Sequence, residues 1–319
     1  MQRNVTLDIM KGIGMVAVIL GHTYTIPTHP YRNIFFSFHM PLFFILAGYF
    51  YKFDQDVKGR LKKDFKRLVV PYILTASLFL VYDFIKACYY HDANCLVFGI
   101  ISVLYGSGSL HSSIYLSNVP IVGPIWFLLA LFWCKVVYNY LIVNNHHANY
   151  LVLGIAIAAT LLDRYVINLP FSLLPGLSAM VFYVIGVIVK KYSVSWPLIT
   201  LCIFCWIVSI MYSHIWMAQC HYGFYPIDVL GACGGTAFVY WISTIVRKTC
   251  FSHPLSWVGF HSLLILCIHS LDMNFNFCSK CNIPEIWYCQ ALFKVSFCVI
   301  FTIIATRLAF VRRMFGLSS

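Results

Sequence analysis

Residues 7–24 read LDIMKGIGMVAVILGHTY, and this stretch decides the fold class. It is an apolar run long enough to cross a bilayer as an α-helix, yet it contains Asp8, Lys11 and His22. Ionisable groups inside a membrane are costly and usually face a bundle interior or a water-filled cavity. The stretch therefore predicts a first membrane helix whose polar face is turned toward other helices.

The composition of the whole chain extends this prediction. Of 319 residues, 61% are hydrophobic and only 10% are charged, and the mean hydropathy is +0.81. A soluble domain carries roughly a quarter of its residues as charged side chains. We therefore expect an all-α integral membrane protein with a single transmembrane domain over residues 1–319. No small-residue cleavage pattern follows the first run, so we interpret it as a retained span.

Ten apolar segments are long enough to be spans, counting one short segment at 150–163. Basic residues concentrate in every second connection between the predicted spans. Because such connections are cytoplasmic, this pattern predicts a bundle of about ten helices with both termini cytoplasmic. The Gly/Ser-rich stretch 96–118 is expected to be a long outer loop that re-enters in part. The predicted spans are 7–25, 34–51, 68–88, 120–143, 150–163, 174–190, 196–215, 227–246, 254–271 and 287–307.

The basic balance of the chain does not require a nucleic acid. The formal net charge of +12 lies mostly on the predicted cytoplasmic rim, where anionic lipid headgroups attract Lys and Arg. Membrane lipids are therefore expected partners, nucleic acid is not, and a homo-oligomer is left open. Most of the thirteen cysteines lie in apolar runs. A loop disulfide is left open among Cys220, Cys278, Cys281 and Cys289.

Helical geometry places the polar residues of the first span on one face. Eleven residues separate Lys11 from His22, which corresponds to a net rotation ~20° from eclipsed and a rise of ~16 Å. Asp8 lies one turn before Lys11. His39 and His269 are expected at the outer ends of their spans, at the depth of His22, and three histidines at one depth indicate a shared cavity. No carboxylate or cysteine spacing reinforces metal binding, so no metal is expected.

A cluster of basic residues precedes the third span on the opposite side. Lys58, Arg60 and Lys62 fit the ordinary cytoplasmic excess of positive charge. Lys63, Lys66 and Arg67 lie at the mouth of the bundle, on the side to which Lys11 points. They could hold phosphate groups through charge-assisted hydrogen bonds. The sequence thus combines an inner anion site with an outer histidine site.

At this point the chain resembles the membrane acyltransferase 3 family, near its fucose O-acetylase-like members. The most specific element is a basic residue followed, after ten residues, by histidine, which is Lys11-x10-His22 here. The family's Arg-x-x-Arg motif is replaced by Lys63-x-x-Lys66 and Arg67. The matching stretches are LDIMKGIGMVAVILGH, FHMPLFFILAGYF, KRLVVPY, PIWFLLALF and LSWVGFHSLLILCIHS.

The resemblance implies transfer of an acyl group, usually acetyl, from cytoplasmic acetyl-CoA to a carbohydrate hydroxyl at the outer face. The acceptor would be a surface polysaccharide or a lipid-linked glycan, and the location the bacterial inner membrane. His22 would be the catalytic base, and His39 or His269 could donate to the developing oxyanion. The implied residues are His22, Lys11 and Asp8 for catalysis, His39, His269 and Trp126 for substrate binding, and Lys63, Lys66 and Arg67 for acyl-CoA.

Two other classes of function compete with this interpretation. A transporter or flippase could use Asp8, Lys11 and the histidines as a proton relay. Against it, the sequence shows no two-half symmetry, and we expect no carboxylate deep in the membrane apart from Asp8 and Asp83. A purely structural scaffold would leave the histidine clustering unexplained.

Overall fold

The computed structural model describes residues 4–23, 30–108, 119–144, 148–165 and 169–317. These residues form helices and one small antiparallel hairpin, in which Ile215 pairs with Tyr222 and Trp216 with His221. In chain order the elements are α1 (Val5–Gly21), α2 (Pro30–Phe36), α3 (His39–Tyr49), α4 (Val57–Asp64), the π-helical η1 (Phe65–Val69), α5 (Val70–Tyr90), α6 (Asn94–Tyr105), α7 (Trp126–Asn144), α8 (Ala148–Tyr165), α9 (Leu173–Ser178), α10 (Met180–Lys191), α11 (Trp196–Tyr212), β1 (Ile215–Trp216), the 3₁₀ turn η2 (Met217–Gln219), β2 (His221–Tyr222), α12 (Tyr225–Val246), α13 (Ser252–Phe260), α14 (Ser262–Phe275), α15 (Phe277–Lys280), α16 (Trp287–Ala305) and α17 (Ala309–Phe315).

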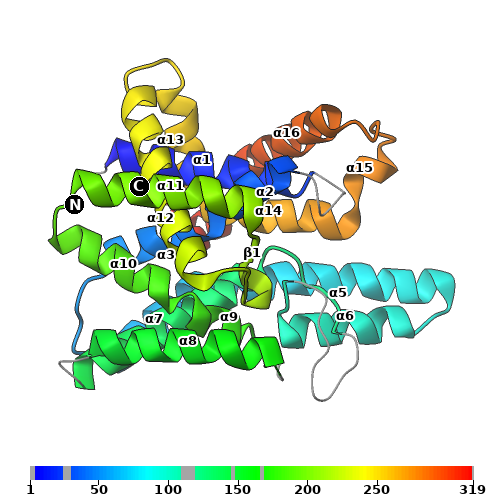
Figure 1. Cartoon of the computed structure of the whole chain (residues 1–319). Helices are drawn as coiled ribbons and strands as arrows, with labels where there is room; N and C mark the ends of the chain where they lie inside the picture. Colours follow the sequence, from blue (N-terminus) through cyan, green and yellow to red (C-terminus); the bar gives the residue numbers. More distant parts are fainter. Residues whose placement is uncertain (1–3, 24–29, 109–118, 145–147, 166–168, 318–319) are drawn as a thin grey trace.

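Apart from the β1–β2 hairpin, the described residues form a helical bundle of the kind that a membrane requires. Figure 1 shows many of its long helices running in roughly one direction, with α5 and α6 projecting together beyond the rest. Within the described residues, five helices are long and apolar enough to cross a membrane, or six if the bent pair α13–α14 is one span. The chain is thus an all-α membrane protein, while the count of ten spans and the cytoplasmic termini stay predictions.

Three parts of the predicted organisation differ in the structure. The stretch expected as a long outer loop contains α6, a twelve-residue helix packed on α5, although residues 109–118 lie outside the described part. The predicted span 34–51 is broken between α2 and α3. The predicted span 254–271 bends by 76° between α13 and α14. Hydropathy detects an apolar run but is insensitive to breaks in it, which explains both interrupted spans.

The basic connection before the third span is helical and continues into that span. Helices α4, η1 and α5 form one unit over Val57–Tyr90, 34 residues long. Its π-helical turn has a local cause, because Pro71 lacks an N–H and its ring would clash with the carbonyl four residues earlier. The N–H of Val70 accordingly bonds to the carbonyl of Phe65, five residues back. The predicted phosphate-binding residues Lys66 and Arg67 lie in this widened turn.

Helix α1 begins at a clear cap and packs closely on α13. The Asn4 side chain accepts hydrogen bonds from the N–H groups of Thr6 (3.1 Å) and Leu7 (3.4 Å), which are otherwise unpaired at a helix start. At the crossing with α13, a Cβ on Gly259 would lie 1.7 Å from the Asp8 carbonyl oxygen. Glycine thus lets the two backbones touch, as small residues do between membrane helices. This contact holds the polar start of α1 against the bundle.

Candidate active site

Three histidines from three helices meet at one point of the bundle. His22 follows the last residue of α1, His39 is the first residue of α3, and His269 lies within α14. The ring centroid of His22 is 6.4 Å from that of His39 and 5.5 Å from that of His269. Residues far apart in the sequence therefore form a single cluster, at the outer end of the first helix as the predicted topology orients it.

Hydrogen bonds define the proton positions on two of these rings. Nδ1 of His22 lies 2.7 Å from the carbonyl oxygen of Val18, and Nδ1 of His39 lies 2.5 Å from that of Phe35. Because a carbonyl oxygen can only accept, Nδ1 carries the proton in each neutral ring and Nε2 carries a lone pair. His22 therefore has the form that a general base requires.

His22 and His39 line a cavity of about 370 Å³, within the range of small-molecule sites, which is roughly 300–1,000 Å³. Trp126, at the start of α7, also lines it, so the structure brings three of the predicted residues to one space. His269 is fully buried beside the His22 ring. The side chains that line the cavity include His22, Arg32, Phe36, His39, Trp126 and Trp216.

An arginine held between aromatic rings forms one wall of this cavity, and the sequence did not single it out. The guanidinium carbon of Arg32 lies 4.5 Å from the ring centroid of Phe36 and 5.0 Å from that of Trp216. The Phe36 ring is 5.4 Å from that of His22. Arg32 is one of few basic residues in the predicted outer connections, and this departure from the charge bias was the available signal.

A second group missed from the sequence lies behind His22. The ammonium of Lys294, within α16, donates to the backbone oxygen of His22 at 3.3 Å. Asp272 lies three residues after His269, is 2% exposed, and neither carboxylate oxygen has a hydrogen-bond partner among the described residues. Both ring nitrogens of His269 likewise have no partner within that part of the chain. The sequence offered one signal for this group, namely a lysine and an aspartate that stand inside apolar helices.

Asp8 and Lys11 form a separate pair further along α1. The Lys11 ammonium lies 3.1 Å from the Asp8 carboxylate and 5.0 Å from the ring centroid of Phe50. The helical rise still places Lys11 ~16 Å from His22, so this pair cannot touch the histidines directly. The predicted stripe on α1 therefore joins two distinct clusters.

Lys63, Lys66 and Arg67 are all exposed. Between them in sequence lies Asp64, which is 2% exposed and accepts from Nε of Arg60 at 3.1 Å and from the ammonium of Lys135. Lys135 belongs to α7, so this ion pair ties the basic segment to the bundle. The sequence did not reveal it, because the partners lie 71 residues apart.

Two further buried carboxylates were not singled out from the sequence, and their depth in the membrane stays untested. Asp228 is fully buried at the start of α12, in addition to Asp272 of α14. Hydroxyl groups of Ser209 and Ser213 donate to Asp228 at 2.6 Å and 2.7 Å. The backbone N–H of Phe224 donates to it at 3.0 Å. Asp228 is thus a satisfied helix-start residue, in the position that suits an acid.

The cysteines form no disulfide in the structure. All thirteen are free, including the four for which a loop disulfide was left open, Cys220, Cys278, Cys281 and Cys289. Among the described residues there is also no group of three or more His, Cys, Asp or Glu that could hold a metal ion.

The fold and the cavity define an integral membrane protein of helices that encloses a histidine-lined site. A family model described as an acyltransferase domain, that of the acyltransferase 3 family, matches residues 4–310. The chain therefore belongs to the acyltransferase 3 family and is a membrane acyltransferase. No curated protein and no solved structure gives a significant match to it.

Proposed function

We propose that the protein moves an acetyl group from cytoplasmic acetyl-CoA to a hydroxyl of a cell-surface or exported carbohydrate, with His22 as the general base. The observation that carries this proposal is the orientation of the His22 ring. Its Nδ1–H is held by the Val18 carbonyl, and the ring lines the cavity, which leaves Nε2 to accept a proton. A sugar hydroxyl is a weak nucleophile near neutral pH and needs such a base.

The reaction can be written with atoms and protons balanced. Nε2 of His22 takes the hydroxyl proton as the sugar oxygen attacks the thioester carbonyl carbon. The tetrahedral intermediate then collapses, the carbon–sulfur bond breaks, and the imidazolium returns the proton to the thiolate of CoA. The products are the acetyl ester of the sugar and free CoA. This use of one histidine as base and then acid is common in acyl transfer.

The geometry supports different tasks for the neighbours of His22 in this proposal. Because Nδ1–H of His39 is committed to the Phe35 carbonyl, its Nε2 is an acceptor in the neutral ring and suits a sugar hydroxyl. It cannot donate to an oxyanion in that form. Arg32, a permanent cation on the cavity wall, is the better candidate for stabilising the developing negative charge.

The donor would be held by the exposed basic residues Lys63, Lys66 and Arg67. Arg60 and Lys135 are engaged by Asp64, whereas these three side chains face outward and can meet the phosphates of CoA. Changing all three to Glu should weaken binding of acetyl-CoA to the purified protein by more than about tenfold.

The matched control for the donor site is the Lys58→Glu/Lys62→Glu variant, since both lysines are exposed on the same helix, α4. It should bind acetyl-CoA within about twofold of the wild type, apart from general screening effects. Equal affinity in the triple variant and the wild type would place the donor site elsewhere.

The proposed activity is tested with the purified protein reconstituted in liposomes. Acetyl-labelled acetyl-CoA and a total cell-surface glycan fraction are added, and label in the glycan is followed by mass spectrometry. We expect acetyl esters on the glycan only when the protein is present. Hydrolysis of acetyl-CoA without any glycan ester, or uptake of a solute without transfer, would refute a carbohydrate O-acetyltransferase.

A further inference from the structure

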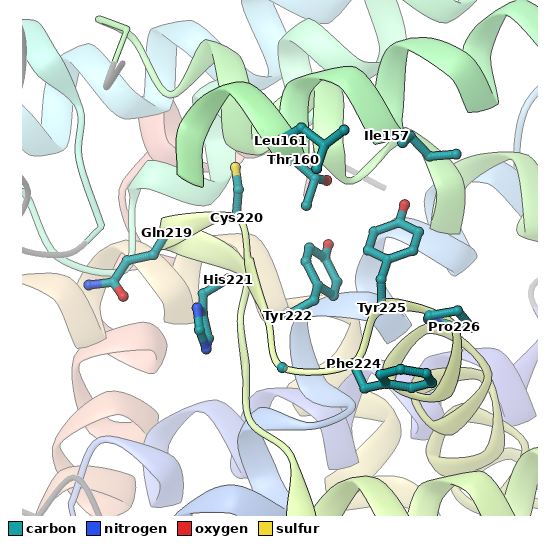
Figure 2. Close-up of a pocket in the computed structure, with 11 residues that line it drawn as sticks. Ile157, Thr160, Leu161, Gln219, Cys220, His221, Tyr222, Phe224, Tyr225 and Pro226 are labelled. Atoms are coloured by element: carbon teal, nitrogen blue, oxygen red, sulfur yellow. The ribbon is translucent and has the colours of Figure 1, made fainter. Parts of the chain in front are cut away.

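A second cavity adjoins the histidine-lined cavity. It has a volume of about 580 Å³ and lies between α8 and residues 219–226, which run from the end of η2 through β2 to the start of α12. Gln219 of η2 lines both cavities. Figure 2 shows Thr160 and Leu161 of α8 on one side, with the rings of Tyr222 and Tyr225 rising toward them. The two cavities therefore meet at Gln219.

Three hydroxyl-bearing residues, Thr160, Tyr222 and Tyr225, line this second cavity, and the buried Ser178 bonds to two of them from outside the lining. Oγ1 of Thr160 and Oγ of Ser178 lie 2.7 Å apart, and Ser178 donates to the Tyr222 hydroxyl at 3.3 Å. The Tyr225 hydroxyl, from the third lining residue, has no hydrogen-bond partner among the described residues. Hydroxyls can both donate and accept, and they can rotate to suit a partner. Such a set is suited to a ligand that is itself rich in hydroxyl groups.

The aromatic rings of the second cavity, and its lack of permanently charged side chains, limit the class of ligand that it can bind. Tyr222, Phe224 and Tyr225 present three rings, on which the C–H face of a sugar ring can pack as an apolar surface. Among the lining residues that the structure describes there is no Asp, Glu, Lys or Arg, and His221 is the one side chain that can become a cation. Phosphate or carboxylate groups would have no permanent cation to pair with there, which disfavours nucleotide sugars and uronic acids.

We propose that this cavity is a second acceptor subsite that binds neutral sugar residues next to the one that is acetylated. The proposal rests on the proposed function, and it deepens it by naming the acceptor class. The acceptor is then a neutral oligosaccharide or polymer whose reacting residue lies beside His22 and whose neighbouring residues pass Gln219 into the second cavity.

The test compares acceptors of different length. Neutral glycan fragments, from monosaccharide to tetrasaccharide, are prepared from the surface glycan that the wild type acetylates, and KM is measured for each in liposomes. In the wild type, KM should be at least about tenfold lower for the tetrasaccharide than for the monosaccharide, as expected for several added hydrogen bonds and a stacked ring.

The Tyr225→Phe/Thr160→Val variant removes two hydroxyls with little change of shape, and it should reduce the length preference to about threefold or less. Each single variant is measured too, so that a folding failure of the pair leaves a result. Tyr240→Phe is the matched control, because Tyr240 is an exposed tyrosine of the same helix, α12, and its variant should keep the wild-type preference.

The possible results of this experiment distinguish failure of the subsite proposal from failure of the proposed function on which it rests. Equal KM for all lengths, or an unchanged preference in the Tyr225/Thr160 variants, would overturn the subsite while acetylation itself stands. A preference that appears only for fragments carrying a lipid chain would overturn it as well, in favour of a lipid in the cavity. Acetylation of no fragment or parent glycan would refute the proposed function and the subsite with it.

Discussion

Asp64 is predicted to be the residue whose charge stabilises the basic segment of α4 and η1 against the bundle. Its side chain is 2% exposed, and those of its partners Arg60 and Lys135 are 15% exposed each. Asp64→Asn keeps the shape but leaves two largely buried cations without a counter-charge. Breaking a buried ion pair by removing one partner costs roughly 3–5 kcal/mol. Because both cations retain some access to solvent, we expect the lower end, about 3 kcal/mol in the free energy of unfolding.

A mutant cycle in detergent measures this contribution. Unfolding is followed with a thiol-reactive dye, because buried cysteines such as Cys134 react only when the bundle opens. Lys135→Met should restore part of the stability lost by Asp64→Asn, since it removes one of the stranded charges. Glu285→Gln, at an exposed carboxylate, is the control. If Asp64→Asn unfolds like this control, the ion pair does not stabilise the basic segment and the reasoning is wrong.

Two further predictions concern the cavity and the packing. Lys294→Met removes the hydrogen bond to the His22 carbonyl. Because the lost bond has a charged donor, kcat should fall about tenfold, with the KM for acetyl-CoA unchanged. An unchanged kcat would contradict a role for Lys294 in holding His22. Gly48→Ala would place a Cβ 2.0 Å from the Tyr183 carbonyl oxygen and should sharply lower the yield and melting temperature in detergent. Gly154→Ala is the control and should lower neither, because its Cβ meets nothing within 4 Å. Equal melting temperatures of the two variants would refute the close packing of α3 on α10.

The sequence was sufficient to predict the class of fold and much of the histidine cluster. Membrane helices follow from runs of apolar residues, because a bilayer forces the backbone to satisfy its own hydrogen bonds. His22, His39 and His269 could be grouped because the topology places them at one depth. Helical periodicity likewise put Asp8 and Lys11 on one face, and they form an ion pair in the structure.

The breaks within the predicted spans, and the partners that are distant in the chain, could not be predicted from the sequence. A hydropathy window averages over a run, so it passes over the break before His39 and also over the single lysine at 294. Asp64 could not be matched with Lys135, because nothing in either local sequence specifies the other. The stretch around α6 was misread because its Gly/Ser-rich second half resembled a loop, although its first half is apolar enough for a helix.

The most direct test of the central claim is the rate of acetyl transfer by the His22→Gln variant. Glutamine keeps a polar side chain of similar reach but cannot act as a base. Folding and insertion are checked by its melting temperature, and His253→Gln, at an exposed histidine of α13, is the control. We predict that His22→Gln lowers the initial rate at least about 100-fold while His253→Gln leaves it unchanged. A folded His22→Gln protein that acetylates the glycan at the wild-type rate would contradict the assignment of His22 as the base.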